Sequence, residues 1–438
     1  MNTDELSAAV NRRTLFRVAI AGAAAAAFPE PLLRGATQPR RWRDDFPALS
    51  QSIDGKPLAY FDSAATTLRP APVIDAVADY YRTANANPSA TLHTLARRSA
   101  GRYAEARSEV ARFINADPRE IIWTRGTTEG INLCAASWGG AHLRAGDEIV
   151  LSIAEHYSNW LPWRTIAART GARVKVFGVT DEGRLDLDDL ARALTPRTRL
   201  VAVGHVSNVL GVINPIDQVV LRARAVGARV FVDGAQSAPH IAVDVKGLGC
   251  DFFVFSSHKM LGPMGTGVAW ARHELLEAMP PYHTGSNMAH DVDLETAVFE
   301  HDGQKFQAGT PNVSGPIGLA AACAYMNTLG RDAIAAHERT VTQRALSMFG
   351  RVPGLTLIGP ATAEQRLPVF CFTLQKAAVP AIVKALDGEG IAIRGGDMAA
   401  LPLLQRFGTR AAARVSCYLY NSVDEIDRLG AALMRLAS

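Results

Sequence analysis

Short apolar stretches recur along residues 120–271, with helix-like segments between them. Most of these stretches are apolar at every position rather than at alternate positions, which is typical of strands covered on both faces. Strands of this kind, separated by helices, form a mostly parallel sheet with helices on both faces. The sequence therefore predicts an α/β fold. Its strands are expected near 120–124, 148–152, 173–178, 199–203, 229–233, 252–255 and 267–271.

The chain is long enough for two domains, because 438 residues exceed what one hydrophobic core usually organises. After the predicted sheet, a long helical region begins near residue 315 and leads into a second group of elements. Strands are expected there near 355–358, 367–374 and 413–418, with helices near 378–388 and 423–436. We expect a linker at 37–46, a large domain at 47–310 whose first segment partly joins the small domain, and a smaller C-terminal α+β domain at 311–438.

The first residues have the layout of an export signal. Arg12 and Arg13 precede an apolar or small-residue run at 18–28. This run is shorter than the roughly 20 residues that span a bilayer. Adjacent arginines before such a run are typical of a twin-arginine signal peptide. We therefore expect a signal at 1–36 and a periplasmic or secreted protein without a stable membrane anchor. The alternative is a disordered or amphipathic N-terminal arm.

Charge and cysteine content exclude two other classes. The formal net charge is +4, and no basic stripe is interleaved with aromatic residues, so nucleic-acid binding is not expected. The five cysteines are scattered, and none forms a Cys-x-x-Cys pair. Neither a metal site nor a disulfide framework is therefore expected.

A lysine follows the apolar run 252–255. At the end of a buried strand, Lys259 would lose water, which favours the neutral amine that attacks an aldehyde. Asp233 ends another apolar strand, and pyridoxal phosphate needs a carboxylate against its ring nitrogen. The pair indicates a pyridoxal phosphate site. The alternatives are a snorkelling lysine at a strand end and a helix-cap or turn aspartate.

Other polar residues follow neighbouring strands, at the sheet edge where α/β proteins bind ligands. Thr127 and Thr128 open a helix whose free amides suit a phosphate, the alternative being a plain N-cap. His156 is placed to stack on a flat ring, or to serve as a structural histidine. Asn208 is placed to donate to a ring hydroxyl or to a substrate carboxylate, the alternative being a turn asparagine.

Several motifs resemble one known family. The chain is similar to the class V aminotransferases of pyridoxal phosphate fold type I, in particular to the branch of cysteine desulfurases and selenocysteine lyases. The resemblance runs from about residue 46 to the C-terminus. It is carried by the stretches RGTTEGINL (125–133), HVSNVLG (205–211), VDGAQS (232–237), SSHKMLGPMGTG (256–267) and AGTPN (308–312).

The resemblance implies a role for each matching residue. Lys259 would form the Schiff base with the cofactor, Asp233 would hold the ring nitrogen and His156 would stack on the ring; these three are the expected catalytic residues. Thr310 would reach the phosphate of a neighbouring subunit, which implies a homodimer. The other expected cofactor-binding residues are Thr127, Thr128, Gln236 (at the ring hydroxyl), Ser256 and His258, and the expected substrate-binding residues are Asn208, Arg394 and Arg414.

One position departs from the family pattern. Desulfurases of this branch carry a cysteine in a loop of the pattern Arg-x-Gly-His-x-Cys-Ala, whereas the matching stretch here places Ala399 at that position. An alanine provides no thiolate to attack a substrate sulfur. Among the five cysteines, Cys417 lies near Arg414 in sequence, but strand alternation turns it to the opposite face.

These observations lead to three hypotheses. The first is a pyridoxal phosphate enzyme that acts on a small amino acid by transamination or by β-elimination at a C–S bond, with Asp397 and Met398 shaping the substrate side of the site. The alternative is a cysteine desulfurase that uses a displaced or external thiol. The third, from another class, is a non-catalytic binding protein on the same fold.

Overall fold

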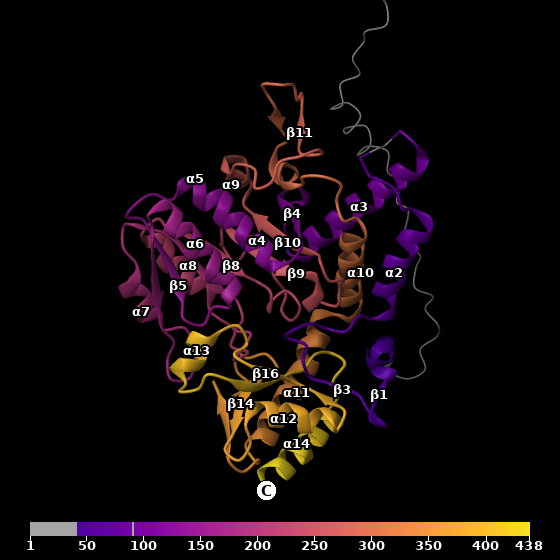
Figure 1. Cartoon of the computed structure of the whole chain (residues 1–438), viewed down its shortest axis with the longest axis vertical. Helices are drawn as coiled ribbons and strands as arrows, with labels where there is room; N and C mark the ends of the chain where they lie inside the picture. Colours follow the sequence, from indigo (N-terminus) through magenta and orange to yellow (C-terminus); the bar gives the residue numbers. More distant parts are fainter. Residues whose placement is uncertain (1–41, 90–91) are drawn as a thin grey trace, which may run out of the picture. The chain divides into compact units, whose positions relative to one another are not determined.

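The structure is a computed structural model that describes residues 42–89 and 92–438. Its central element is a seven-stranded sheet in the order β4-β10-β9-β8-β7-β5-β6 (Figure 1). Strand β10 is antiparallel to both of its neighbours, and every other pair in the sheet is parallel, which confirms the predicted mostly parallel sheet. The strands are β4 (Ile121–Thr124), β5 (Glu148–Ser152), β6 (Arg173–Phe177), β7 (Thr198–Gly204), β8 (Arg229–Asp233), β9 (Phe252–Ser256) and β10 (Gly267–Ala271).

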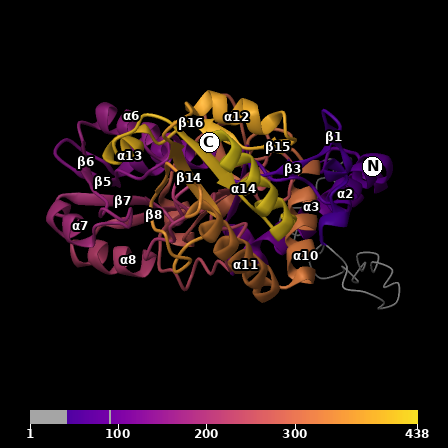
Figure 2. The same ribbon diagram turned by 90° about the horizontal axis from the view of Figure 1, so that it is seen from below.

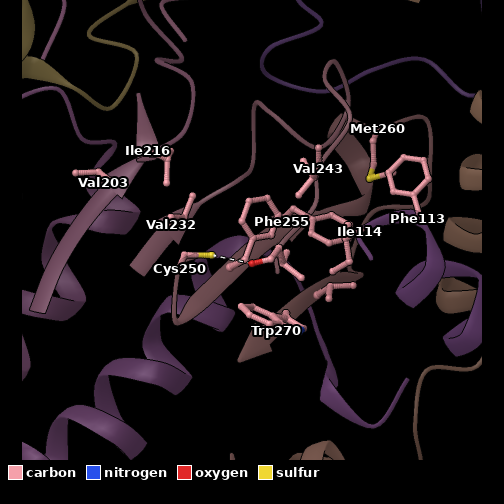
Figure 3. Packing of buried hydrophobic residues seen from close by; sticks show 14 of the residues in the cluster. Phe113, Ile114, Val203, Ile216, Val232, Val243, Cys250, Phe255, Met260 and Trp270 are labelled. Atoms are coloured by element: carbon pink, nitrogen blue, oxygen red, sulfur yellow. Dashed lines mark hydrogen bonds between the residues drawn. The ribbon is translucent and has the colours of Figure 1, made fainter. Parts of the chain in front are cut away.

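Both faces of this sheet are buried, because successive residues of its strands enter different hydrophobic clusters. In β8, Val230 and Val232 belong to one cluster and Phe231 belongs to the other. Figure 3 shows part of the first cluster, in which Phe255 of the sheet lies towards Ile114, and Phe113 lies beside Met260. That cluster includes residues of α2 (Ala71–Thr83), α3 (Thr94–Phe113), α8 (Ile216–Ala225) and α10 (Ser314–Leu329). The second includes residues of α4 (Thr127–Cys134), α6 (Leu161–Thr170) and α9 (His273–Ala278).

A second, smaller sheet has four antiparallel strands in the order β13-β14-β17-β16. They are β13 (Leu355–Ile358), β14 (Val369–Leu374), β17 (Ala412–Ser416) and β16 (Arg394–Gly396). Side chains of this sheet form a separate core with three helices, which Figures 1 and 2 show gathered around β14. These helices are α11 (Arg331–Phe349), α12 (Val379–Asp387) and α14 (Val423–Ala437).

An N-terminal segment lies beside this small sheet. Strand β3 (Ala59–Tyr60) pairs with β15 (Ile391–Ala392), and Asp62 bridges Ser416 of β17. Residues 42–438 form one compact unit by their contacts, so the division at residue 310 stays a prediction. The remaining α-helices and strands of the described residues are α5 (Gly140–His142), α7 (Leu187–Ala193), α13 (Leu401–Arg406), the pair β1 (Ser52–Ile53) and β2 (Lys56–Pro57), and the hairpin β11 (Ala289–His290) with β12 (Val298–Phe299).

The predicted strands of the large sheet agree with the observed ones to within one residue at each end. The predicted signal at 1–36 lies outside the described residues, as does the first half of the predicted linker, 37–41. Among the helices of residues 42–89 and 92–438, none has the length and apolar character needed to cross a membrane.

Candidate active site

A cavity of about 270 Å³ lies where β5, β7, β8 and β9 end. Loops that follow these strands line one side, and residues of β16, β17 and the turn 397–399 line the other. The cavity brings together every predicted site residue except Thr310. These residues are Thr127, Thr128, His156, Asn208, Asp233, Gln236, Ser256, His258, Lys259, Arg394 and Arg414.

Lys259 follows β9 in a single 3₁₀ turn, Ser257–Lys259, and its partly exposed side chain lines the cavity. Burial lowers the pKa of Lys259 from 10.5 to about 8, and the nearby Arg414 and Arg394 also lower it, while Asp233 raises it. A substantial fraction of the amine is therefore neutral near physiological pH, as a nucleophilic lysine requires.

Two acids lie on the floor of the cavity. Asp233 is the last residue of β8, and its Oδ1 accepts a hydrogen bond from the Ala235 amide at 2.9 Å. Burial raises the pKa of Asp233, whereas that amide and the charge of Lys259 lower it. Glu155 is buried beside it, and burial raises the pKa of Glu155 to about 8. The net effect raises the pKa of both acids, so Glu155 is largely neutral near pH 7, and a cationic group bound in the cavity would favour the charged form of Asp233.

The two histidines of the cavity are neutral. Burial, together with the charges of Lys259 and Arg414, lowers the pKa of His156 to about 4, and its Nδ1 accepts a hydrogen bond from the Ser158 amide at 3.1 Å. Burial, Lys259 and Arg69 likewise lower the pKa of His258 to about 4. A neutral imidazole suits the stacking role predicted for His156, because it adds no positive charge next to Lys259.

The N-terminus of α4 forms a polar cradle with β9. The amide of Thr127 donates to Ser256 Oγ at 2.8 Å, and the two hydroxyls lie 2.7 Å apart. Gly126, just before the helix, has a φ of +153°, and a Cβ on it would lie 3.1 Å from Ser256 Oγ. Glycine at this position leaves room at the helix end, where amides and hydroxyls suit a phosphate.

Arg414 is buried in the side of the cavity that faces the loops of the large sheet. Its guanidinium donates to the Asn208 carbonyl at 3.1 Å and to Asp62 Oδ1 at 3.0 Å. Its buried Nε has no hydrogen-bond partner among the described residues. Arg394, about half exposed, lies 3.9 Å from the other oxygen of Asp62. Two arginines thus share one carboxylate, which leaves positive charge available to an anionic group in the cavity.

Two predicted residues make contacts that the sequence did not indicate. Asn208 Nδ2 donates to the Met398 carbonyl at 2.8 Å, so this amide holds the turn 397–399. Gln236 Nε2 donates to the Ala64 carbonyl at 2.8 Å. Both side chains still line the cavity. Sequence reasoning also left out Glu155 and Asp62 as site residues.

Thr310 lies away from the cavity on an exposed loop. Its hydroxyl accepts from Asn87 Nδ2 at 3.5 Å, and it is not among the residues that line the cavity. Within one chain, Thr310 therefore does not join the other predicted cofactor residues.

All five cysteines lie in the described part of the chain, and all are buried and outside the cavity lining. Burial raises the pKa of Cys250 and of Cys371 to about 12, and it raises the pKa of Cys134, Cys323 and Cys417 further. Cys417 packs in the core of the small sheet, whereas Arg414 lines the cavity, as strand alternation predicted. No thiol of this chain is thus placed to accept sulfur there.

The arrangement fits a flat, phosphorylated aldehyde. An amine with a pKa of about 8, a buried carboxyl group and a neutral imidazole face one cavity, and two hydroxyls lie at a helix N-terminus at its end. The fold and this site define a pyridoxal phosphate-dependent enzyme of fold type I.

The comparisons with known proteins agree. The model of the family described as aminotransferase class-V matches residues 59–429, and the chain belongs to this family. A cysteine desulfurase of Cronobacter sakazakii is 44% identical over 90% of this chain and 97% of its own length. A cysteine desulfurase of Synechococcus elongatus is also 44% identical over 90% of this chain, but the chain spans only 63% of that relative.

Solved structures show the same fold. The cysteine desulfurase from Thermococcus onnurineus NA1 has a TM-score of 0.87 and 34% identity over 92% of this chain and 99% of its own. The cysteine desulfurase CsdA from Escherichia coli has a TM-score of 0.84 and 35% identity with the same coverage. The family is pyridoxal phosphate-dependent, and these relatives favour the desulfurase alternative over transamination.

The prediction of export to the periplasm or beyond is wrong. The chain matches cysteine desulfurases over 90% of its length, and nothing in these matches indicates a signal peptide or a periplasmic location. An arginine pair before a short apolar run involves few residues, so this pattern alone does not determine where a protein is located.

The charge of Asp233 is expected to be essential. The Asp233→Asn substitution keeps the shape of the side chain and removes the charge that would hold the cofactor nitrogen protonated. We expect turnover of an amino acid substrate to fall by about 10²–10³-fold, the usual loss for one preorganised electrostatic group. Steady-state kinetics would measure it, with the exposed Asp387→Asn as the control. A loss of less than fivefold would contradict the assigned role.

The lowered pKa of Lys259 predicts how cofactor capture depends on pH. Only the neutral amine attacks an aldehyde, so capture by cofactor-free protein should rise with pH and level off above the pKa of about 8. Stopped-flow absorbance after mixing with pyridoxal phosphate would give the midpoint. A midpoint near the ordinary lysine value of 10.5 would show that Lys259 is not perturbed.

Proposed function

We propose that this protein cleaves the C–S bond of cysteine and passes the sulfur to a thiol that does not belong to this chain. One observation carries the second half of the proposal: Ala399 lines the cavity, and every cysteine is buried away from it. The first half is supported by the cavity residues and by relatives named cysteine desulfurases.

The residues that would hold pyridoxal phosphate come from the large sheet. Thr127 and Ser256 would bind its phosphate, Asp233 its ring nitrogen, and His156 the face of its ring. Lys259 would hold it covalently. When bound, the cofactor draws electrons from the α-carbon of an amino acid, which makes the bonds at the α- and β-carbons easier to break.

The remaining roles fall to this chain's own groups. Arg414 would pair with the substrate carboxylate, because its guanidinium is fixed by Asp62 and by the Asn208 carbonyl while Nε stays unpartnered. Lys259 would move the α-proton, since a pKa of about 8 allows its amine to accept and return a proton near neutral pH.

The sulfur step balances as cysteine plus an external thiol giving alanine plus a persulfide. The thiolate sulfur forms the new S–S bond and is oxidised, and the Cβ–S bond breaks with its electron pair remaining on carbon. The β-carbon is reduced and takes up a proton. Ala399 cannot act as the attacking group, so the thiol must enter from solution or from another protein.

Alanine analysis with and without added thiol tests this proposal. With cysteine and dithiothreitol, we expect alanine and sulfide in equal amounts. Because cysteine is itself a thiol, alanine formed without dithiothreitol should be accompanied by an equal amount of persulfide instead of sulfide. Pyruvate and sulfide, independent of thiol, would instead show β-elimination, the second candidate that the thiol-free cavity favours. A keto acid formed from an amino donor without sulfide would show transamination.

We further propose that the protein is a homodimer in which Thr310 serves the partner's site. The exposed position of Thr310, away from the cavity of its own chain, supports this arrangement. Sedimentation should give twice the chain mass of 46.9 kDa. A monomer that binds the cofactor at full occupancy would overturn the proposal.

A further inference from the structure

The turn 397–399 has a strained backbone. Met398 and Ala399 have φ values of +54° and +53°, in the left-handed region that residues with a Cβ rarely adopt. Two consecutive residues of this kind persist only where neighbouring groups hold them. The turn also lines the cavity, through both Met398 and Ala399.

Hydrogen bonds from two sides hold the turn. Tyr157 donates twice, from its hydroxyl to Asp397 Oδ2 at 2.7 Å and from its amide to the Ala399 carbonyl at 2.7 Å. Inside the turn, the Ala399 amide donates to Asp397 Oδ1 at 3.0 Å. From the other side, Asn208 Nδ2 donates to the Met398 carbonyl. The turn is therefore fixed against both the large sheet's loops and its own aspartate.

Because the turn is fixed, the position of Met398 relative to the cavity is fixed as well. Met398 is only 4% exposed and lines the same cavity as Lys259 and Arg414. The backbone carbonyl of Met398 accepts a hydrogen bond from the Asn208 side chain, and the backbone carbonyl of Asn208 accepts one from Arg414. Met398 also belongs to the first hydrophobic cluster, so an amino acid held by Arg414 would lie next to a fixed apolar residue.

We infer that Met398 sets the upper size of the substrate side chain, and that Tyr157 and Asp397 are positioning residues that hold it in place. The inference rests on the proposed function in that the ligand is an amino acid bound at Arg414. It assigns the substrate class as amino acids with short, unbranched side chains.

Binding of an unbranched series tests the inference without catalytic turnover. Alanine, 2-aminobutyrate, norvaline and norleucine would be titrated into holoenzyme, with the visible absorbance of the cofactor as the readout. In the wild-type protein, we expect Kd to rise at least tenfold from alanine to norvaline. Met398→Ala should reduce that ratio to threefold or less, and Met398→Leu, which keeps the volume, should restore it. Met434→Ala, an exposed methionine on α14, is the matched control.

Tyr157→Phe tests the positioning role. This variant loses the hydroxyl bond to Asp397 and keeps the amide bond to Ala399. We expect at least tenfold faster hydrogen exchange at the amides of residues 399 and 400, and a Kd ratio between those of the wild type and Met398→Ala. A purely structural tyrosine would change thermal stability without changing the Kd ratio.

The outcomes separate the inference from the proposed function. An unchanged length dependence in Met398→Ala, or a flat one in the wild-type protein, overturns the inference. A tenfold dependence that Met398→Ala removes supports it, even if cysteine yields no alanine, in which case only the proposed desulfuration fails. If no member of the series perturbs the cofactor, the inference is overturned, and alanine formation from cysteine decides the proposed function separately.

Discussion

Replacing Lys259 by alanine is expected to lower cysteine turnover by at least about 10⁴-fold, the upper range for the loss of one acid–base group. The loss should reach this range because the same amine would both hold the cofactor and move the proton. The cofactor should also become removable by dialysis, since no covalent bond would retain it. Turnover would be measured by alanine formation, and retention by absorbance after dialysis.

Lys246→Ala is the matched control for this change, because Lys246 is exposed and is not among the residues that line the cavity. We expect it to keep both turnover and cofactor. Turnover within tenfold of the wild type in Lys259→Ala would show that another group does the chemistry.

Replacing Ala399 by cysteine is expected to create an acceptor inside the cavity. With cysteine as substrate and no added thiol, the wild-type protein should form no persulfide on the chain. The Ala399→Cys variant should form up to one persulfide per chain, with an equal amount of alanine. The backbone tolerates the change, because alanine and cysteine both carry a Cβ and meet the same φ of +53°. Mass spectrometry of the intact chain would measure it.

Ala400→Cys is the control for this gain. Ala400 is fully buried in the large core and does not line the cavity, so a thiol there should stay unmodified. If Ala399→Cys binds the cofactor and yields alanine only with external thiol, position 399 is not adjacent to the reacting sulfur.

The sequence predicted the large sheet well because its signal is local. Continuous apolar runs such as 252–255 are typical of a sheet covered on both faces, and where the strands are parallel the polar residues after them lie at one edge. This is why Lys259, Asp233 and His156 could be placed together before any coordinates. Thr310 could not be placed this way, because its loop follows no strand of that edge.

What the sequence did not provide are contacts between distant segments. Asp62 is hydrogen-bonded to Arg414, which lies 352 positions later in the sequence. Tyr157 is hydrogen-bonded to Asp397, which lies 240 positions later. Neither pair has a spacing pattern that marks it. Glu155 stood next to a predicted residue, but only its burial beside Asp233 makes it part of the site. The strained turn at Met398 and Ala399 could not be predicted either, because neither of its two left-handed residues is a glycine.

The account depends most on a covalent bond between Lys259 and the cofactor. Reducing the purified wild-type holoenzyme with borohydride and mapping its peptides by mass spectrometry tests that bond directly. The account predicts the added cofactor mass on the peptide that contains Lys259 and on no other lysine. Modification of a different lysine, or a reduced protein that releases all of its cofactor on unfolding, would contradict it.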